Sequence, residues 1–138
     1  MVIKMVNDRE LYVLGRQAAD VAMTKGTVEQ VRRLSDLAHQ AYLAGSGAFN
    51  TSTQAFINLL IQLGFEPPES LQHYQWVIMF SAAQQEILDY RDQARSYEAL
   101  KRTADRVKHG ELAGTYSPER LEYVESQLSN QAKKLLAM

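Results

Sequence analysis

The sequence predicts an all-α protein of about five helices, a helical bundle with a long fourth helix and a C-terminal antiparallel αα-hairpin. Three observations predict this class. Apolar residues recur at three- and four-residue spacing, capping residues with Gly or Pro divide the chain, and a stretch of about 40 residues before Gly110 contains neither glycine nor proline. The length of 138 residues is typical of one domain. We therefore expect one all-α domain over 1–138, with a helical core over 1–88 and a hairpin arm over 89–138.

The first helix is expected over 8–24. Asn7 followed by Glu10 forms a capping box, in which the Asn oxygen accepts from the third helical N–H and the Glu reaches back. An apolar stripe then follows the helical repeat: Leu11, Leu14, Ala18 and Ala22. Gly26 occupies the position where a left-handed residue ends a helix.

Capping pairs also open the next two helices. Thr27 with Gln30 predicts a second helix over 28–44, which ends before a glycine-serine-glycine segment. Thr51 with Gln54 predicts a third, short helix. Because apolar residues occupy most of its circumference, we expect the third helix to be central and buried.

The fourth helix is expected to begin near Pro68 or Glu69, since proline is accepted only in a first helical turn. The next helix breaker is Gly110, so the sequence leaves open one long helix or two helices with a bend. Residues 76–80 are apolar on all sides, which indicates core. The second half carries only a narrow apolar stripe: Tyr90, Ala94, Tyr97, Leu100, Ala104 and Val107.

The last helix is expected over 118–137, with Ser117 as its cap and Pro118 at its first position. It carries a matching stripe: Leu121, Val124, Leu128, Ala132 and Leu135. The segments 90–109 and 118–137 have similar length and a short loop between them. They are therefore predicted to form the antiparallel hairpin.

Composition narrows the classes of function. Fifteen Lys and Arg residues balance sixteen Asp and Glu residues, so no net field draws the chain toward nucleic acid or an anionic membrane. The absence of cysteine removes disulfides, Cys-ligated zinc and a thiol nucleophile, which suits a cytoplasmic location. We expect no signal peptide and no membrane span, because the most apolar stretch, 55–65, is interrupted by Asn58 and Gln62.

One acidic pattern matches that of the all-α nucleoside triphosphate pyrophosphatases, Glu-x-x-Glu followed by Glu-x-x-Asp. The matching residues are Glu66, Glu69, Glu86 and Asp89. Glu86 and Asp89 would share one helix face, as a Mg²⁺ site requires. Two prolines separate Glu66 from Glu69 and force Glu66 out of the helix. We therefore expect a solvated acidic face and no metal site, and a Mg-dependent nucleotide hydrolase is the second alternative function.

Other catalytic patterns do not emerge. The histidines, His39, His73 and His109, are not spaced at three or four residues from one another, and no Gly-rich phosphate loop is present. His109 suits the negative end of a helix dipole, and His73 suits a surface position or a contact with a tyrosine. We expect no enzyme activity, no catalytic residue and no cofactor.

Segment 21–34 superficially resembles a helix-turn-helix, with Gly26 in the turn and two arginines on the following helix. Lys25 and Thr27 stand where that motif requires apolar contacts. We therefore expect two consecutive core helices joined by a tight turn.

An arginine row is the most specific candidate for binding. At 100° per residue, Arg91, Arg95, Arg102 and Arg106 project within 60° of one another along about 22 Å of the fourth helix, opposite the apolar stripe. The pairs at i,i+4 repel by a few tenths of a kcal/mol, and Glu98 is expected to offset part of this at Arg102. Three interpretations remain open: a solvated face, a docking site for an acidic protein surface, or a site for a phosphate backbone.

Tyr90 and Tyr97, one heptad apart, are the aromatic candidates for a partner-binding face. Their alternative role is packing within the hairpin. The best expectation is a small, non-enzymatic helical protein–protein interaction module, an adaptor or regulator that binds another protein or itself as a homodimer. A symmetric dimer would cover apolar width that a two-helix contact leaves exposed. The first alternative is a nucleic-acid-binding protein that uses the arginine row.

Overall fold

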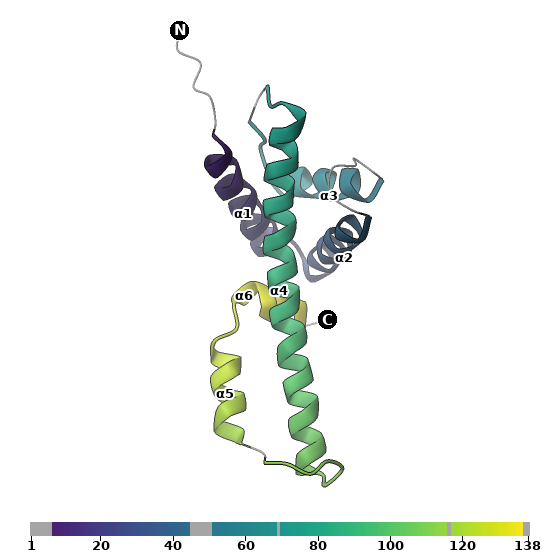
Figure 1. The fold of residues 1–138 in the computed structure, drawn as a ribbon, viewed down its shortest axis with the longest axis vertical. Coiled ribbons are helices and arrows are strands. Elements are labelled where there is room, and N and C mark those ends of the chain that lie inside the picture. The colour runs from purple at the N-terminus through teal and green to yellow at the C-terminus, as the bar shows by residue number, and fades with distance from the viewer. Residues whose placement is uncertain (1–6, 45–50, 69, 116, 137–138) are drawn as a thin grey trace. The chain divides into compact units, whose positions relative to one another are not determined.

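A computed structural model describes residues 7–44, 51–68, 70–115 and 117–136. The regular structure of these residues is entirely helical and comprises six helices (Figure 1). They are α1 (Asp8–Lys25), α2 (Val28–Ala44), α3 (Thr51–Gln62), α4 (His73–Lys108), α5 (Pro118–Ser126) and α6 (Asn130–Leu136). The chain divides into two compact units, Met1–Asp89 and Tyr90–Met138. The all-α class is confirmed, and the expectation of about five helices agrees roughly with the six that the described residues form.

The capping boxes place the first two helices within one residue of their predicted ends. Asn7 Oδ1 accepts from the Glu10 N–H at 2.9 Å. Thr27 Oγ1 accepts from the Gln30 N–H at 3.1 Å, and Gln30 Oε1 accepts from the Thr27 N–H at 2.9 Å. Reciprocal bonds of this kind satisfy backbone donors that have no partner inside the helix, which explains why both helices begin at these positions.

Gly26 corrects one expectation, because its backbone is extended (φ −67°, ψ 149°) and not left-handed. The reason for a glycine here is space. A Cβ atom would lie 2.9 Å from the Ala22 carbonyl oxygen and 3.3 Å from Val31 Cγ2. The tight turn between α1 and α2 therefore needs the smallest residue for its close approach.

Helix α3, which was expected to be central and buried, is buried along one face. Phe56 and Leu60 are fully buried, whereas Ile61 is 45% exposed. Gly64, with φ 111°, follows the helix, and the Phe65 N–H donates to the Leu60 carbonyl at 3.0 Å. The Thr51 side chain, predicted to cap this helix, lies outside the described side chains.

Helix α4 begins at His73, later than the predicted Pro68 or Glu69, and Glu69 itself lies outside the described residues. Ser70 has a left-handed backbone (φ 61°), which interrupts any helix that starts at the prolines. Gln75 Oε1 accepts from the Gln72 N–H at 2.9 Å and forms the actual capping contact. From His73 the helix is continuous for 36 residues, which answers the question that the sequence left open.

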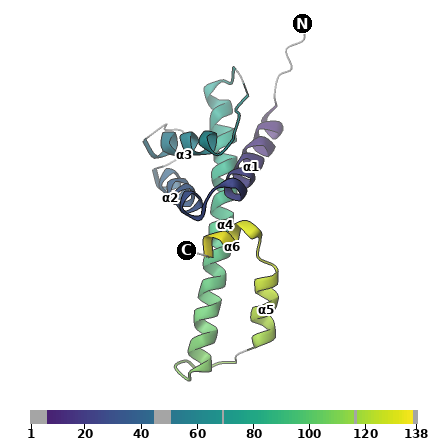
Figure 2. The same cartoon turned by 180° about the vertical axis from the view of Figure 1, so that it is seen from behind.

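The first unit has a closely packed core. Its largest fully buried side chains come from α1, α2, α3 and the first part of α4: Leu11, Met23, Val31, Leu34, Phe56, Leu60, Met79 and Ile87. Helices α2 and α3 pack against each other (Figure 2). Gly15 of α1 lies so near α4 that a Cβ atom would be 2.1 Å from the Met79 carbonyl oxygen. Within 76–80, only Met79 and Phe80 are buried, and Trp76 stacks on Phe80 with ring centroids 5.1 Å apart.

The second unit contains the C-terminal part of α4 with α5 and α6, and it shows that one helix over 118–137 was the wrong prediction. Helix α5 ends at Ser126, and Ser129 starts a new helix by accepting from the Ala132 N–H at 3.1 Å. Ser129 also donates to Gln93 Oε1 of α4, from its hydroxyl at 2.8 Å and its N–H at 3.0 Å. A serine that caps a helix and binds α4 at the same time explains the break.

Candidate interaction surface

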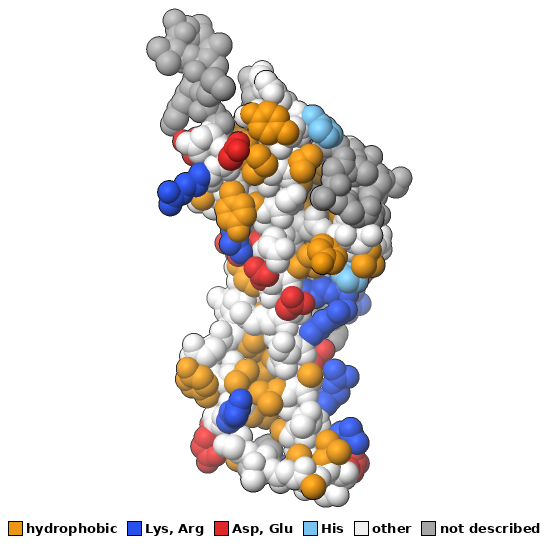
Figure 3. All heavy atoms as spheres, in the orientation of Figure 1, with side chains coloured by type: hydrophobic (Ala, Val, Ile, Leu, Met, Phe, Trp, Pro, Cys, Tyr) orange, Lys and Arg blue, Asp and Glu red, His pale blue; other side chains and the backbone are white. Residues whose placement is uncertain are grey.

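The arginine row, defined as Arg91, Arg95, Arg102 and Arg106, lies on the C-terminal part of α4. The side chains of Arg95, Arg102 and Arg106 are exposed, and Arg91 is half-buried. Figure 3 shows basic side chains along one edge of this part of α4. The continuous helix keeps the four positions within 60° of one another, as the 100° repeat requires.

Acidic neighbours neutralise only part of the arginine row. Arg106 forms an ion pair with Glu111, from Nε to Oε2 at 3.4 Å, with both side chains more than half exposed. Such an exposed pair contributes between about 0 and 1 kcal/mol. The expected pairing of Glu98 with Arg102 is not found among the described side chains. Arg95 and Arg102 are therefore the exposed members of the row that form no ion pair with a described side chain.

The two candidate tyrosines differ in their surroundings. Tyr97 is 8% exposed, and its hydroxyl lies near the Glu125 carboxylate of α5. Burial raises the pKa of Tyr97, and the negative charge of Glu125 raises it further. Tyr90 is half-buried. Tyr97 therefore packs within its own unit and offers little surface to a partner.

An apolar seam lies where α5 faces α4. We define the seam by five half-buried residues: Leu100, Ala104, Val107, Leu121 and Val124. Helix α5 has no buried residue, so it covers α4 only partly. Deeper packing comes from α6, where Ala132 and Leu135 are buried, and from Leu128 just before it. Apolar side chains remain visible between these segments (Figure 3).

The outer face of α5 was not predicted. It consists of Glu119, Glu122 and Tyr123, which are all exposed, Tyr123 by 65%. At 100° per residue, Glu122 and Tyr123 project within 60° of Glu119, whereas Leu121 and Val124 of the seam project on the other side of the helix. The sequence does contain a signal for this acidic face. Three glutamates and one arginine in nine residues make α5 the most acidic of the described helices for its length.

The carboxylates of the pyrophosphatase-like pattern have a different partner. Arg16 of α1 binds Glu86 through Nε and Asp89 through Nη2, the latter at 3.1 Å. The hydrogen bond to Glu86 holds the pKa of Arg16 above its usual value, and the charges of Glu86 and Asp89 add to the effect. Tyr12 contacts the same guanidinium, with its ring centroid 5.3 Å away. The cluster joins α1 to α4.

The first half of the acidic pattern does not combine with Glu86 and Asp89 into a metal site. Glu66 is exposed and precedes the two prolines, outside any helix. Across the described residues, no group of three or more His, Asp or Glu side chains is arranged to hold a metal ion. Glu86 and Asp89 therefore serve as the acidic partners of Arg16, a role that sequence spacing alone could not indicate.

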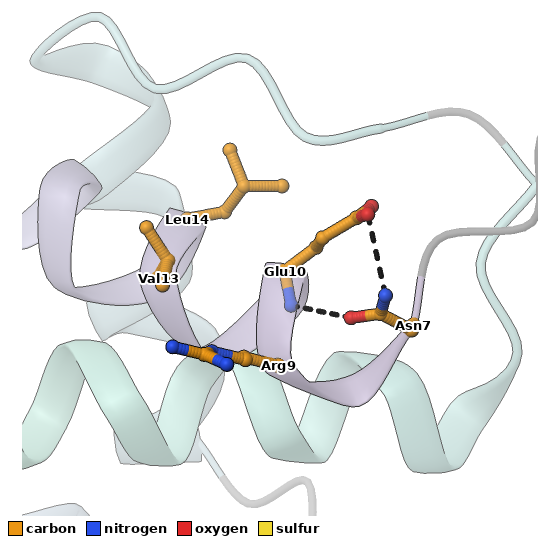
Figure 4. Close-up of a pocket in the computed structure, with 5 residues that line it drawn as sticks. All are labelled: Asn7, Arg9, Glu10, Val13 and Leu14. Atoms are coloured by element: carbon orange, nitrogen blue, oxygen red, sulfur yellow. Dashed lines mark hydrogen bonds between the residues drawn. The ribbon is translucent and has the colours of Figure 1, made fainter.

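Two open pockets lie elsewhere on the first unit. One, of about 490 Å³, is lined by Asn7, Arg9, Glu10, Val13 and Leu14 (Figure 4). Its Asn7 and Glu10 are engaged in capping each other. The other, of about 460 Å³, lies along α2 and includes the arginines of the helix-turn-helix-like segment, where Glu29 and Asp36 accompany Arg32 and Arg33. This mixed charge lacks the single sign that a phosphate backbone favours.

The histidines remain apart from these surfaces. His39 is half-buried, and His73 and His109 are exposed. His109 lies in the turn after α4, where its Nδ1 is 2.7 Å from the Asp105 carbonyl oxygen.

Among the described helices, none combines the length and apolar character needed to cross a membrane.

Comparisons with known proteins add no relatives: no family model, no curated protein and no solved structure matches this chain.

Proposed function

We propose that this chain is a small, non-enzymatic helical interaction module that binds a protein surface through its C-terminal unit. The observation that carries the proposal is the pair of exposed arginines, Arg95 and Arg102, for which no ion pair is found among the described side chains. By the helical repeat both project from the side of α4 opposite the apolar seam, and both side chains are exposed. A row of like charges on one helix face is slightly unfavourable until an anionic surface compensates it.

An acidic protein surface is favoured over a phosphate backbone. Nucleic-acid affinity at physiological salt depends on many phosphate contacts at once. The row supplies Arg95 and Arg102, with Arg106 already paired to Glu111 and Arg91 half-buried. Two planar guanidinium groups, in contrast, suit bidentate contacts with a few carboxylates. Nucleic-acid binding through the arginine row is the competing proposal.

The symmetric homodimer expected from the apolar stripes has less support than the arginine row. Tyr97, Leu128 and Leu135 are buried within one chain and are not available to a second one. The half-buried seam and the half-buried Tyr90 remain for such a contact. Self-association is therefore proposed as one form of the same protein-binding activity, with its mode considered separately below.

The test is capture from a native cell extract with the full chain as bait, with and without nuclease. We expect a protein partner that resists nuclease and is lost with Arg95→Glu plus Arg102→Glu. A matched control, Lys101→Glu plus Lys133→Glu, makes the same change in charge at exposed positions off the row and should retain the partner. Loss of the captured material after nuclease would favour the nucleic-acid alternative, and equal capture by both variants would contradict a role for the row.

A further inference from the structure

The two charged surfaces of the C-terminal unit are complementary to each other. The arginine row presents Arg95 and Arg102, and the outer face of α5 presents Glu119 and Glu122 with the exposed ring of Tyr123. Carboxylates spaced by three residues on a helix lie close enough for one arginine pair to reach both. The Tyr123 ring also offers a face on which a guanidinium can stack.

The two surfaces cannot meet within one chain. Helix α5 runs beside the C-terminal part of α4 (Figure 1), with Leu121 and Val124 half-buried and Glu125 near the buried Tyr97. The arginine row projects from the opposite side of α4, about 180° from Leu100 by the helical repeat. The outer face of α5 points away from α4, and so also away from the arginine row. Each surface is thus accessible only to another molecule.

We propose that a second copy of this chain is the acidic partner, and that copies associate head to tail. The arginine row of one copy contacts Glu119, Glu122 and Tyr123 of the next. This inference rests on the proposed function and specifies its partner. Because the two surfaces lie on opposite sides of the same unit, a contact between two copies leaves one row and one α5 face unused. Such a heterologous contact continues into larger assemblies unless it closes into a ring.

Charge reversal tests this arrangement in the full chain. Light scattering after size exclusion should show a wild-type mass that rises with concentration beyond twice 15.6 kDa and falls with added salt. Arg95→Glu plus Arg102→Glu should weaken self-association about tenfold or more, and so should Glu119→Arg plus Glu122→Arg. Circular dichroism verifies that each variant remains helical.

The four substitutions combined in one chain provide the decisive variant. They restore the wild-type net charge of −1 and exchange the two surfaces, so self-association should return. A folded fourfold variant that stays monomeric would overturn the proposed contact. So would a wild-type mass that remains at 15.6 kDa up to about 1 mM, or one that stops at the dimer and ignores both charge reversals. In these cases capture of a different protein through Arg95 and Arg102 would leave the proposed function standing.

Discussion

The two units of this chain differ in how completely they bury their apolar side chains. In Met1–Asp89, eight large side chains are buried to within 2% of complete. In Tyr90–Met138, the described residue with complete burial is an alanine, Ala132, and α5 has no buried residue at all. Since stability grows with buried apolar area, the first unit has the larger driving force for folding. The second unit leaves more of its residues available for contacts with other molecules.

The largest expected change in stability comes from replacing a leucine by alanine in the first unit, compared with the same replacement in the second. Leu60→Ala should lower the free energy of unfolding by about 2–5 kcal/mol, because Leu60 is fully buried and its removal leaves a cavity. Leu121→Ala, at the half-buried seam, should cost about 1 kcal/mol. Urea unfolding followed by circular dichroism measures both. Equal losses would show that the seam is packed as closely as the first core.

A second expected loss lies at the crossing of α1 and α4. Gly15→Ala should destabilise the first unit by about 1–3 kcal/mol, because the added Cβ atom would overlap the Met79 carbonyl. An alanine normally favours a helix over glycine by about 1 kcal/mol, so a loss identifies the steric cause. Gln17→Ala, at an exposed position of the same helix, is the control. Increased stability in Gly15→Ala would contradict the close approach.

The Arg16 cluster should contribute less than the apolar core. Arg16→Gln should cost about 1 kcal/mol, because Glu86, whose side chain is 15% exposed, loses its partner while Asp89 remains well hydrated. Combining Arg16→Gln with Glu86→Gln should recover part of the loss, as a double-mutant cycle would measure. Additive losses in the cycle would show that the two side chains do not interact.

The smallest effect concerns Tyr97, and it depends on pH. The folded chain raises the pKa of Tyr97 above the unfolded value of about 10. The stabilisation by the neutral hydroxyl is therefore fully present below pH ~10 and is lost as pH rises through the raised folded-state pKa. Tyr97→Phe should cost about 0.5 kcal/mol at neutral pH and remove this alkaline dependence.

Thermal unfolding between neutral and alkaline pH measures the Tyr97 effect, with Tyr123→Phe as the exposed control. An unchanged alkaline dependence in Tyr97→Phe would show that another group causes it. Hydrogen exchange of the amides of α5 would further separate the two units, because a helix without buried residues should exchange faster than α3.

Structural features that depend on residues close together in the sequence could be predicted. The capping boxes at Asn7 and Thr27 act over three residues, and they fix the starts of α1 and α2 wherever the helices later pack. The start of α4 was not predicted correctly, because serine at position 70 is not a residue type that signals a left-handed backbone. Serine ordinarily avoids that conformation, and only the surrounding structure can impose it.

Features that depend on distant residues could not be predicted from local patterns. The end of α5 follows from the bond between Ser129 and Gln93, residues separated by 36 positions. The pairing of Arg16 with Glu86 spans 70 positions, so spacing suggested a metal-like pattern where the folded chain has an ion pair. The arginine row was predictable because a helix repeat determines it, whereas the acidic outer face of α5 depends on which side of α5 is covered.

The contact at Gly15 also bears on the evolution of this fold. A backbone carbonyl occupies the space where every other amino acid has its Cβ atom. Any homologue that keeps this helix crossing must therefore keep a glycine at this position, whatever happens to its surface. The next residue, Arg16, selects carboxylates one turn apart on the opposing helix. Together they form a Gly-Arg signature, paired with Glu-x-x-Asp some 70 residues later. This signature should stay recognisable in distant homologues even where other positions have been substituted.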